Sequence, residues 1–225
     1  MKKLLLLLLS VAFSTSCGTI GNGVTRSTTY KTLYDESPAS ILALPPINRS
    51  TKVEAKELFY SSLTPSLTQK GYYVLPPLLS MEILKEESAY DAELFMNNSM
   101  KQAGQLFGVD AVLFTIIHDW SKSTIGSQVH VKIEYILKST KTDEVLFNRI
   151  GDVRMNLSVN SGNALVDLLG GMVATALTKE IVVGRNCNFY TLSDLPEGVY
   201  SPAFKNDGGV EAGAKEFKAT INQSY

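Results

Sequence analysis

Residues 109–120, VDAVLFTIIHDW, contain the apolar run that decides the fold of this chain. From 111 to 117 the run has the length of one strand and no apolar–polar alternation, which is typical of a central strand covered on both faces. The next segment, QVHVKIEYILK at 128–138, alternates and predicts a strand with one buried face. After a turn at 140–144, a third long strand is expected over 145–158, with a bulge or a twist near Gly151 where its alternation shifts phase. These three strands predict an antiparallel meander.

Two short strands, at 41–44 and 72–75, precede this meander, and helical segments connect them. The first expected helix starts at a Thr51/Glu54 capping box, is kinked or restarted at Pro65, and stops at Gly71. Further helices are expected over 78–84 and over about 93–107, the latter with a stop at Gly108. The last is expected over 161–183 with Ser161 as N-cap. Strands that are joined through helices pair in parallel. The order β-α-β-α-β-β-β-α therefore predicts an α/β fold, with a mixed sheet of about five strands and helices packed on it.

The last expected helix is unusually apolar and contains small residues at Gly170, Gly171 and Ala174. Small side chains allow another backbone to approach closely. The close neighbour is expected to be the protein's own sheet, with a contact to another subunit as the alternative, so a homo-oligomer stays open.

The chain divides into four parts by composition. A signal peptide is expected over 1–16, a lipidated N-terminus and flexible tether over 17–38, a single globular domain over 39–200, and a polar C-terminal tail over 201–225. The first part has a signal's charged start at Lys2 and Lys3 and an apolar core too short to span a bilayer.

The segment STSC, which ends at Cys17, follows the leucine run and resembles the lipobox of bacterial lipoproteins. Ser14 departs from the leucine usually found at its position in that pattern. The resemblance implies that Cys17 is lipidated with acyl chains such as palmitate and becomes the mature N-terminus. Gly18 replaces the aspartate that would retain a lipoprotein in the inner membrane, which favours the outer membrane, facing the periplasm. The alternative is an ordinary signal peptide with an incidental cysteine.

Few residues offer chemistry. The formal net charge of −1 gives no electrostatic basis for binding nucleic acid. His118 and Asp119 are the only plausible acid–base centre, although a packed histidine at the edge of the sheet is the favoured interpretation, and His130 is expected to face solvent. Asp110 is expected to bond backbone amides. The sequence predicts no catalytic, cofactor or metal site.

Cys187 is the second cysteine of the chain. If Cys17 carries a lipid, Cys187 has no partner within the chain, so it is either a buried thiol, which is favoured, or part of an intermolecular disulfide.

The segments LPPINRSTKVEAKE, GYYVLP, GVDAVLF and IIHDW, in this order, resemble a family of bacterial lipoproteins of unknown function. Members of that family are described as auxiliary components of an ABC-type transport system, and one is a meningococcal vaccine antigen. More distantly, the chain is similar to the N-terminal domain of TolB and to the envelope lipoproteins CsgG and LpoB. The family has no established catalytic residues to transfer.

The resemblance implies a lipid-anchored periplasmic adaptor or auxiliary protein of an envelope transport, secretion or cell-wall complex. Its expected partners are the membrane, through Cys17, and other envelope proteins. Two alternatives stay open: a carrier of a small apolar ligand, and an enzyme centred on His118.

Overall fold

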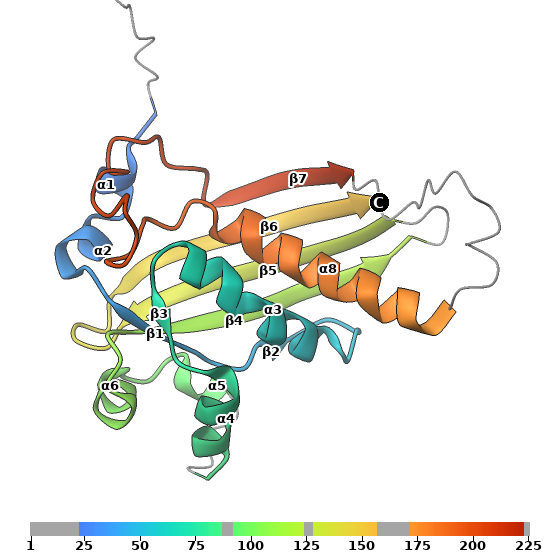
Figure 1. Cartoon of the computed structure of the whole chain (residues 1–225), viewed down its shortest axis with the longest axis horizontal. Coiled ribbons are helices and arrows are strands. Elements are labelled where there is room, and N and C mark those ends of the chain that lie inside the picture. The colour runs from blue at the N-terminus through green and yellow to red at the C-terminus, as the bar shows by residue number, and fades with distance from the viewer. Residues whose placement is uncertain (1–22, 87–91, 124–127, 157–171, 223–225) are drawn as a thin grey trace, which may run out of the picture.

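Strand β4 (Ala111–Lys122) lies in the middle of a mixed sheet (Figure 1). This computed structural model describes residues 23–86, 92–123, 128–156 and 172–222. Within these residues the sheet has seven strands in the order β3-β1-β4-β5-β6-β7, with β2 also paired to β4. The other strands are β1 (Ser40–Ala43), β2 (Ile47–Asn48), β3 (Tyr73–Val74), β5 (Gln128–Ser139), β6 (Val145–Asn156) and β7 (Glu216–Asn222).

The pairing directions agree with the sequence prediction. β1 is parallel to both β3 and β4, while β4, β5 and β6 form an antiparallel meander. β4 is buried from Ala111 through Ile117, as its unbroken apolar run predicts. The predicted α/β fold with a mixed sheet is therefore confirmed, and the structure adds β2 and β7 to the five expected strands.

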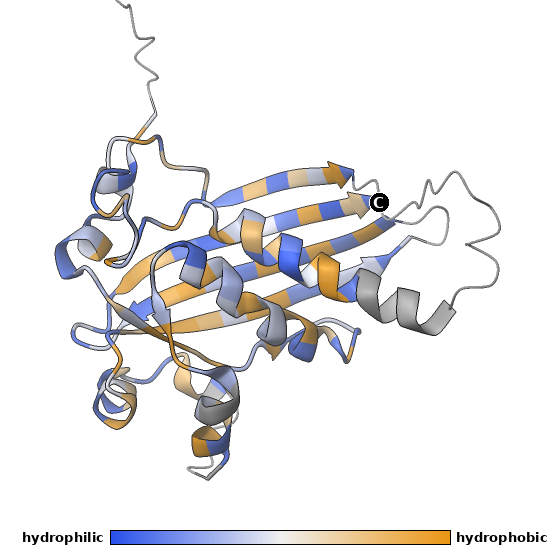
Figure 2. Cartoon of the chain, viewed as in Figure 1, coloured by the Kyte–Doolittle hydropathy of each residue, from blue (hydrophilic) through white to orange (hydrophobic). Residues whose placement is uncertain are grey.

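Helices cover the two faces of the sheet unequally (Figures 1 and 2). One face packs against α3 (Ala55–Gln69) and α8 (Met172–Leu192), and its core includes Phe59, which meets the ring of Trp120 edge-on. The opposite face of β1, β2 and the first half of β4 packs against α4 (Pro77–Glu86), α5 (Ala92–Phe95) and α6 (Lys101–Phe107). This second core stops before the end of β4.

The connecting helices differ from their predicted forms in three details. Pro65 lies within a continuous α3, and the Thr51/Glu54 capping box is wrong because α3 begins at Ala55 without a side-chain cap. The single helix expected over 93–107 is two short helices, and the second begins where Asp143 accepts a hydrogen bond from the amide of Met100. The stops are confirmed, since Gly71 and Gly108 both have positive φ angles.

Helix α8 continues to Leu192, so the helix end expected at 183 is wrong. The polar residue Asn188 lies within this continuation, and its side chain is buried between α3 and β5. Cys187 is also fully buried, which favours the buried-thiol interpretation, and burial raises the pKa of that thiol. Ser161, Gly170 and Gly171, on which the question of a subunit contact depends, lie outside the described residues.

The N-terminal part of the domain starts earlier than predicted. Residues 24–38, expected to belong to a flexible tether, contain α1 (Arg26–Thr29) and α2 (Lys31–Glu36). Tyr30 and Leu33 are buried in the main core, so the expected tether is wrong for this segment. Because this segment is rich in serine and threonine, the sequence did not indicate that Tyr30 and Leu33, three positions apart on a helix, belong to the core.

The expected polar tail over 201–225 is also wrong in part, because β7 pairs in parallel with β6. The residues of β7 alternate, but Phe217, Ala219 and Ile221 on its apolar side are only partly buried, and polar residues lie between them. The predicted bulge near Gly151 is wrong as well, since the register of β5 with β6 runs unbroken through that residue. Gly151 instead leaves room for α8, because a Cβ atom there would lie 2.3 Å from Oγ1 of Thr191.

No helix within the described ranges is both long and apolar enough to cross a membrane.

Asp110 has the structural role that the sequence predicts. Its Oδ2 accepts hydrogen bonds from the amides of Ala39 and Ser40, at 3.0 and 3.2 Å, and from the Ser40 hydroxyl at 3.0 Å. Burial alone would raise the pKa of Asp110, but these donors outweigh it and lower the pKa. The carboxylate thereby joins the start of β4 to the start of β1.

We expect Asp110→Asn to lower the free energy of unfolding by about 1 kcal/mol at pH 7. Because the folded-state pKa of Asp110 is lowered, the ionised carboxylate stabilises the protein above its ordinary pKa of about 4, and this contribution is lost as the pH falls further. The difference between wild type and variant should therefore shrink below about pH 4. Urea unfolding of wild type and variant at pH 7 and pH 3 measures this difference in the free energy of unfolding. An equal difference at the two pH values would contradict the proposed role of the ionised Asp110 carboxylate.

Candidate functional site: the polar face of the sheet

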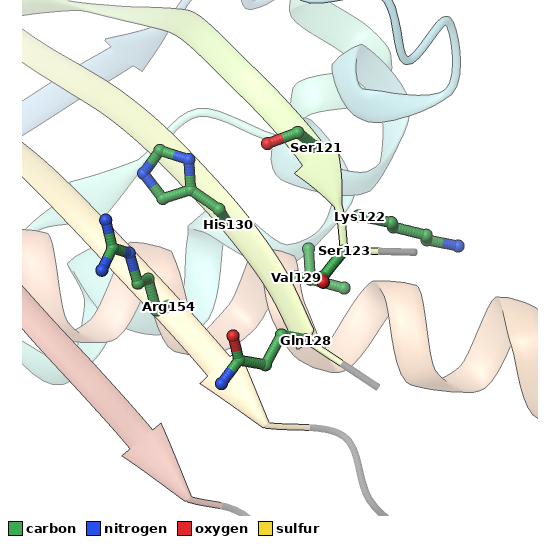
Figure 3. A pocket seen from close by; sticks show the side chains of 7 residues that line it. All are labelled: Ser121, Lys122, Ser123, Gln128, Val129, His130 and Arg154. Carbon is green, nitrogen blue, oxygen red and sulfur yellow. The ribbon is translucent and has the colours of Figure 1, made fainter. Parts of the chain in front are cut away.

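The strongest cluster of chemically active side chains lies on the sheet face turned away from α8, over the end of β4 and over β5, β6 and β7. Figure 3 views part of this face, with α8 behind the strands. We call it the polar face, and it consists of His118, Asp119, Ser121, His130, Lys132, Glu134, Asn148, Asp152, Arg154, Glu216 and Lys218. The period-2 alternation of β5 and β6 produces it, since apolar residues occupy the other face.

A bulge in β4 places His118 and Asp119 on the same side of the sheet. The register of β4 with β5 shifts between Ile117 and Asp119. His118 and Asp119 nevertheless bind different partners: Nε2 of His118 lies 2.9 Å from Oε2 of Glu134, and Oδ2 of Asp119 lies 3.0 Å from Nδ1 of His130. The two residues named as the only plausible acid–base centre therefore belong to two separate hydrogen-bonded groups.

His130 is the central member of the second group, and its predicted exposure to solvent holds only in part, since its side chain is 32% exposed. Its Nδ1 meets Asp119 at 3.0 Å and its Nε2 meets Asp152 at 2.7 Å, so one imidazole bridges β4 and β6 across β5. The imidazole of His130 therefore lies between two carboxylates, and Nζ of Lys218 lies 4.0 Å from Oδ2 of Asp152.

Further cross-strand bonds fix the rest of the polar face. Glu134 accepts a hydrogen bond from the side-chain amide of Asn148 at 2.8 Å, and Lys132 pairs with Glu216 at 2.9 Å. The contact with Glu216 raises the pKa of Lys132. Because these bonds join β4, β5, β6 and β7, they order side chains that a strand surface would otherwise leave mobile.

A pocket of about 180 Å³ opens at the far end of these strands (Figure 3). Its lining is Ser121, Lys122, Ser123, Gln128, Val129, His130 and Arg154. This lining contains three basic side chains and no carboxylate. Arg154, which is opposite His130 in the strand register, is exposed, and its guanidinium forms no hydrogen bond or ion pair with any other residue that the structure describes. Nζ of Lys122 already donates to Glu180 at 2.6 Å, and both ring nitrogens of His130 contact carboxylates. The guanidinium of Arg154 is therefore the basic group that the pocket offers to a small anionic group.

Sequence reasoning missed Arg154, Asp152 and the pocket. The alternation of β6 put both residues on its polar side, which is the signal that was available. Their approach to His130 depends on the register between β5 and β6, and no local pattern gives that register. Within the described ranges, no group of three or more His, Cys, Asp or Glu side chains is arranged to hold a metal ion.

The fold and this face together define a mixed α/β domain in which α3 and α8 cover one face of the sheet, while α4, α5 and α6 cover only part of the other and leave the polar face open. The chain belongs to the GNA1162-like lipoprotein family, because the family model "Putative lipoprotein GNA1162-like" matches residues 28–197. The family predicted by resemblance is confirmed. Membership implies that the protein is membrane-associated, and neither the family description nor the relatives' names assign a catalytic activity.

A sequence relative and a solved structure, both from Neisseria meningitidis, are similar to this chain. "Putative lipoprotein NMB1124/NMB1162" of serogroup B is 28% identical over 154 residues, which cover 66% of this chain and 72% of the relative. The crystal structure of lipoprotein GNA1162 is 28% identical with a TM-score of 0.49, over 65% of this chain and 99% of that one. A more distant solved structure, the LpoB C-terminal domain from Salmonella enterica, is 13% identical with a TM-score of 0.39, over 57% and 93% of the two chains.

Proposed function

We propose that this protein is a lipid-anchored periplasmic adaptor of an envelope transport, secretion or cell-wall complex, and that it binds its partner through the polar face. The observation that carries the proposal is Arg154, an exposed guanidinium without a counter-charge among the described residues, beside a pocket lined by hydrogen-bond donors. An acidic side chain or the terminal carboxylate of a partner would complement it. Family membership supports the membrane anchor.

The geometry supports this function better than the two alternatives. A carrier of apolar ligands needs a cavity lined by apolar side chains, whereas Val129 is the one apolar residue among the seven that line this pocket. The pairing of His118 with Asp119 that an acid–base centre was expected to use is not formed, because His118 contacts Glu134 and Asp119 contacts His130.

Charge reversal tests the polar face. We expect Arg154→Glu to reduce recovery of the native partner from chemically cross-linked envelopes by 10-fold or more, because one lost charge-assisted contact at an interface is worth at least about 1.4 kcal/mol. Arg185 is an exposed residue of α8, on the other side of the sheet from the polar face. Arg185→Glu makes the same change of charge and should leave recovery of the partner unchanged. The measurement is quantitative mass spectrometry of the cross-linked partners of the full chain.

Equal recovery with both variants would contradict the proposed face. Thermal unfolding of both variants should match wild type, because Arg154 has no described intramolecular partner to lose. A small molecule that co-purifies, with no protein partner recovered, would favour a carrier instead.

The anchor has its own test. We propose that Cys17 is lipidated and that the protein resides in the outer membrane, facing the periplasm. Intact-mass analysis of the native protein should find the acyl additions on a chain that begins at Cys17, and Cys17→Ala should abolish them. A native chain without acyl groups would contradict the anchor, and acylated protein in the inner-membrane fraction would contradict the location.

A further inference from the structure

The packed N-terminal segment fixes where the chain enters the domain. The amide of Arg26 donates to the carbonyl of Val210 at 2.8 Å, and the amide of Ala212 donates to the carbonyl of Val24 at 2.8 Å. Arg26 also pairs with the partly buried carboxylates of Asp194 and Asp207, at 3.1 and 3.3 Å. Residue 24 is therefore held against the loop between α8 and β7, at one end of the sheet (Figure 1).

The short stretch of chain between Cys17 and Val24 limits how far the domain can lie from the lipid anchor. This step rests on the proposed lipidation of Cys17. Seven residue-to-residue steps separate Cys17 from Val24, and seven steps of a fully extended chain span at most about 25 Å. Because the lipids hold Cys17 at the membrane surface, Val24 and the adjoining loop must stay close to that surface.

The surface around this entry point carries exposed apolar side chains. Val24 is 58% exposed, Val210 is 48% exposed and Tyr200, in the same loop as Val210, is 68% exposed. Nζ of Lys205 lies 5.3 Å from the ring centre of Phe204 in this loop. Tyrosine is enriched at membrane–water interfaces, where its ring contacts lipid and its hydroxyl contacts water, and lysine there extends its ammonium toward the headgroups.

The pocket lies at the opposite end of the long strands. Glu36 of α2 accepts hydrogen bonds from Ser139 and Thr142, so the β5–β6 turn lies at the end where the chain enters. From there β5 runs to Val129, whose partner Lys122 is in the pocket lining. Ten steps from Ser139 to Val129, at about 3.3 Å each, separate the two ends by roughly 33 Å.

We propose that the domain stands on the bilayer at its α1 end, with Val24, Tyr200 and Val210 against the lipid headgroups and the Arg154 pocket held roughly 30–35 Å farther from the surface. In this orientation the strands run away from the membrane. The protein presents its polar face to partners at a set height, rather than moving freely around a long tether.

Spin labels on the lipidated full-length chain test this orientation. One nitroxide is attached at Val210→Cys and, in a second sample, at Arg154→Cys; Cys187 is fully buried and does not compete for the label. The protein is reconstituted into phosphatidylethanolamine–phosphatidylglycerol vesicles that contain gadolinium chelated to a lipid headgroup. We expect gadolinium to enhance the relaxation of the label at position 210 at least fivefold more than that of the label at 154.

Equal enhancement at both positions, or greater enhancement at 154, would overturn the orientation. Intact mass of the same samples separates this failure from that of the anchor: an acylated chain with equal enhancement contradicts the orientation alone, whereas an unacylated chain contradicts the anchor and the orientation together. Replacing Val24 and Tyr200 by Glu in the chain labelled at 210 should reduce the enhancement there. No change in that variant would show that the apolar side chains do not hold the orientation.

Discussion

Asp194→Ala should lower the free energy of unfolding by about 3 kcal/mol, because it removes the central acceptor of a buried network. Oδ1 of Asp194 pairs with Arg26 at 3.1 Å, while its Oδ2 accepts from the Tyr30 hydroxyl at 2.6 Å and from the amide of Gly213 at 2.9 Å. The side chains of Arg26 and Asp194 are only 14% and 5% exposed. The substitution leaves a buried guanidinium with Asp207 as its remaining carboxylate partner.

The network joins α1 to the loop before β7, so removing the Asp194 carboxylate should destabilise both segments. Burial and the Asp194 carboxylate both raise the pKa of Tyr30, so the phenol stays neutral and donates. Nearby, Arg149 donates to the carbonyls of Tyr190, Thr191 and Ala214 and lies over the ring of Phe217, 4.4 Å from its centre. In Asp194→Ala, hydrogen exchange should therefore become faster in both α1 and the loop before β7.

Urea unfolding measures the change, and Asp35→Ala is the matched control. Asp35 pairs with Lys31 in the neighbouring helix α2, but both side chains are more than half exposed. An exposed pair contributes little because water screens it, so the control should unfold within error of wild type. If the two variants lose equal stability, the buried network does not hold the N-terminal segment.

Asn188→Ala should also lower the free energy of unfolding by about 3 kcal/mol, because Asn188 joins three elements in the core. Its side chain is fully buried. Nδ2 donates to Oγ of Ser62 at 2.9 Å and to the carbonyl of Phe59 at 3.3 Å, both in α3, and Oδ1 accepts from the Tyr135 hydroxyl of β5. The substitution leaves a cavity and a buried hydroxyl without its acceptor.

A double-mutant cycle with Tyr135→Phe tests this explanation. Tyr135→Phe alone should cost about 1 kcal/mol, since it leaves the Asn188 oxygen without a donor. In Asn188→Ala the Tyr135 hydroxyl has already lost its acceptor, so adding Tyr135→Phe should cost nothing further or restore some stability. Strictly additive losses in thermal or urea unfolding would show that the two side chains do not act on each other.

The sequence by itself predicted the parts of this protein whose signal is local. The apolar run of β4 and the alternation of β5 and β6 gave the antiparallel meander, because side-chain period directly reflects which strand faces are buried. Gly71 and Gly108 marked two helix ends, since glycine readily adopts a positive φ angle. The family was identified from short segments distributed along the domain, and the match over 28–197 confirms it.

The tertiary structure alone decided the elements that depend on partners far away in the sequence. The segment around Arg26 is ordered by Asp194, 168 positions later, and β7 acquires its partner only when the chain returns to β6. Asn188 continues α8 because Tyr135 and α3 satisfy its amide. His130 is a bridge because the register of three strands brings Asp119 and Asp152 to its two nitrogens. Arg26 and Asn188 tolerate burial through bonds that only the folded chain supplies, and β7 and His130 obtain their partners only from strand register. Local composition could therefore not predict the structure of these segments.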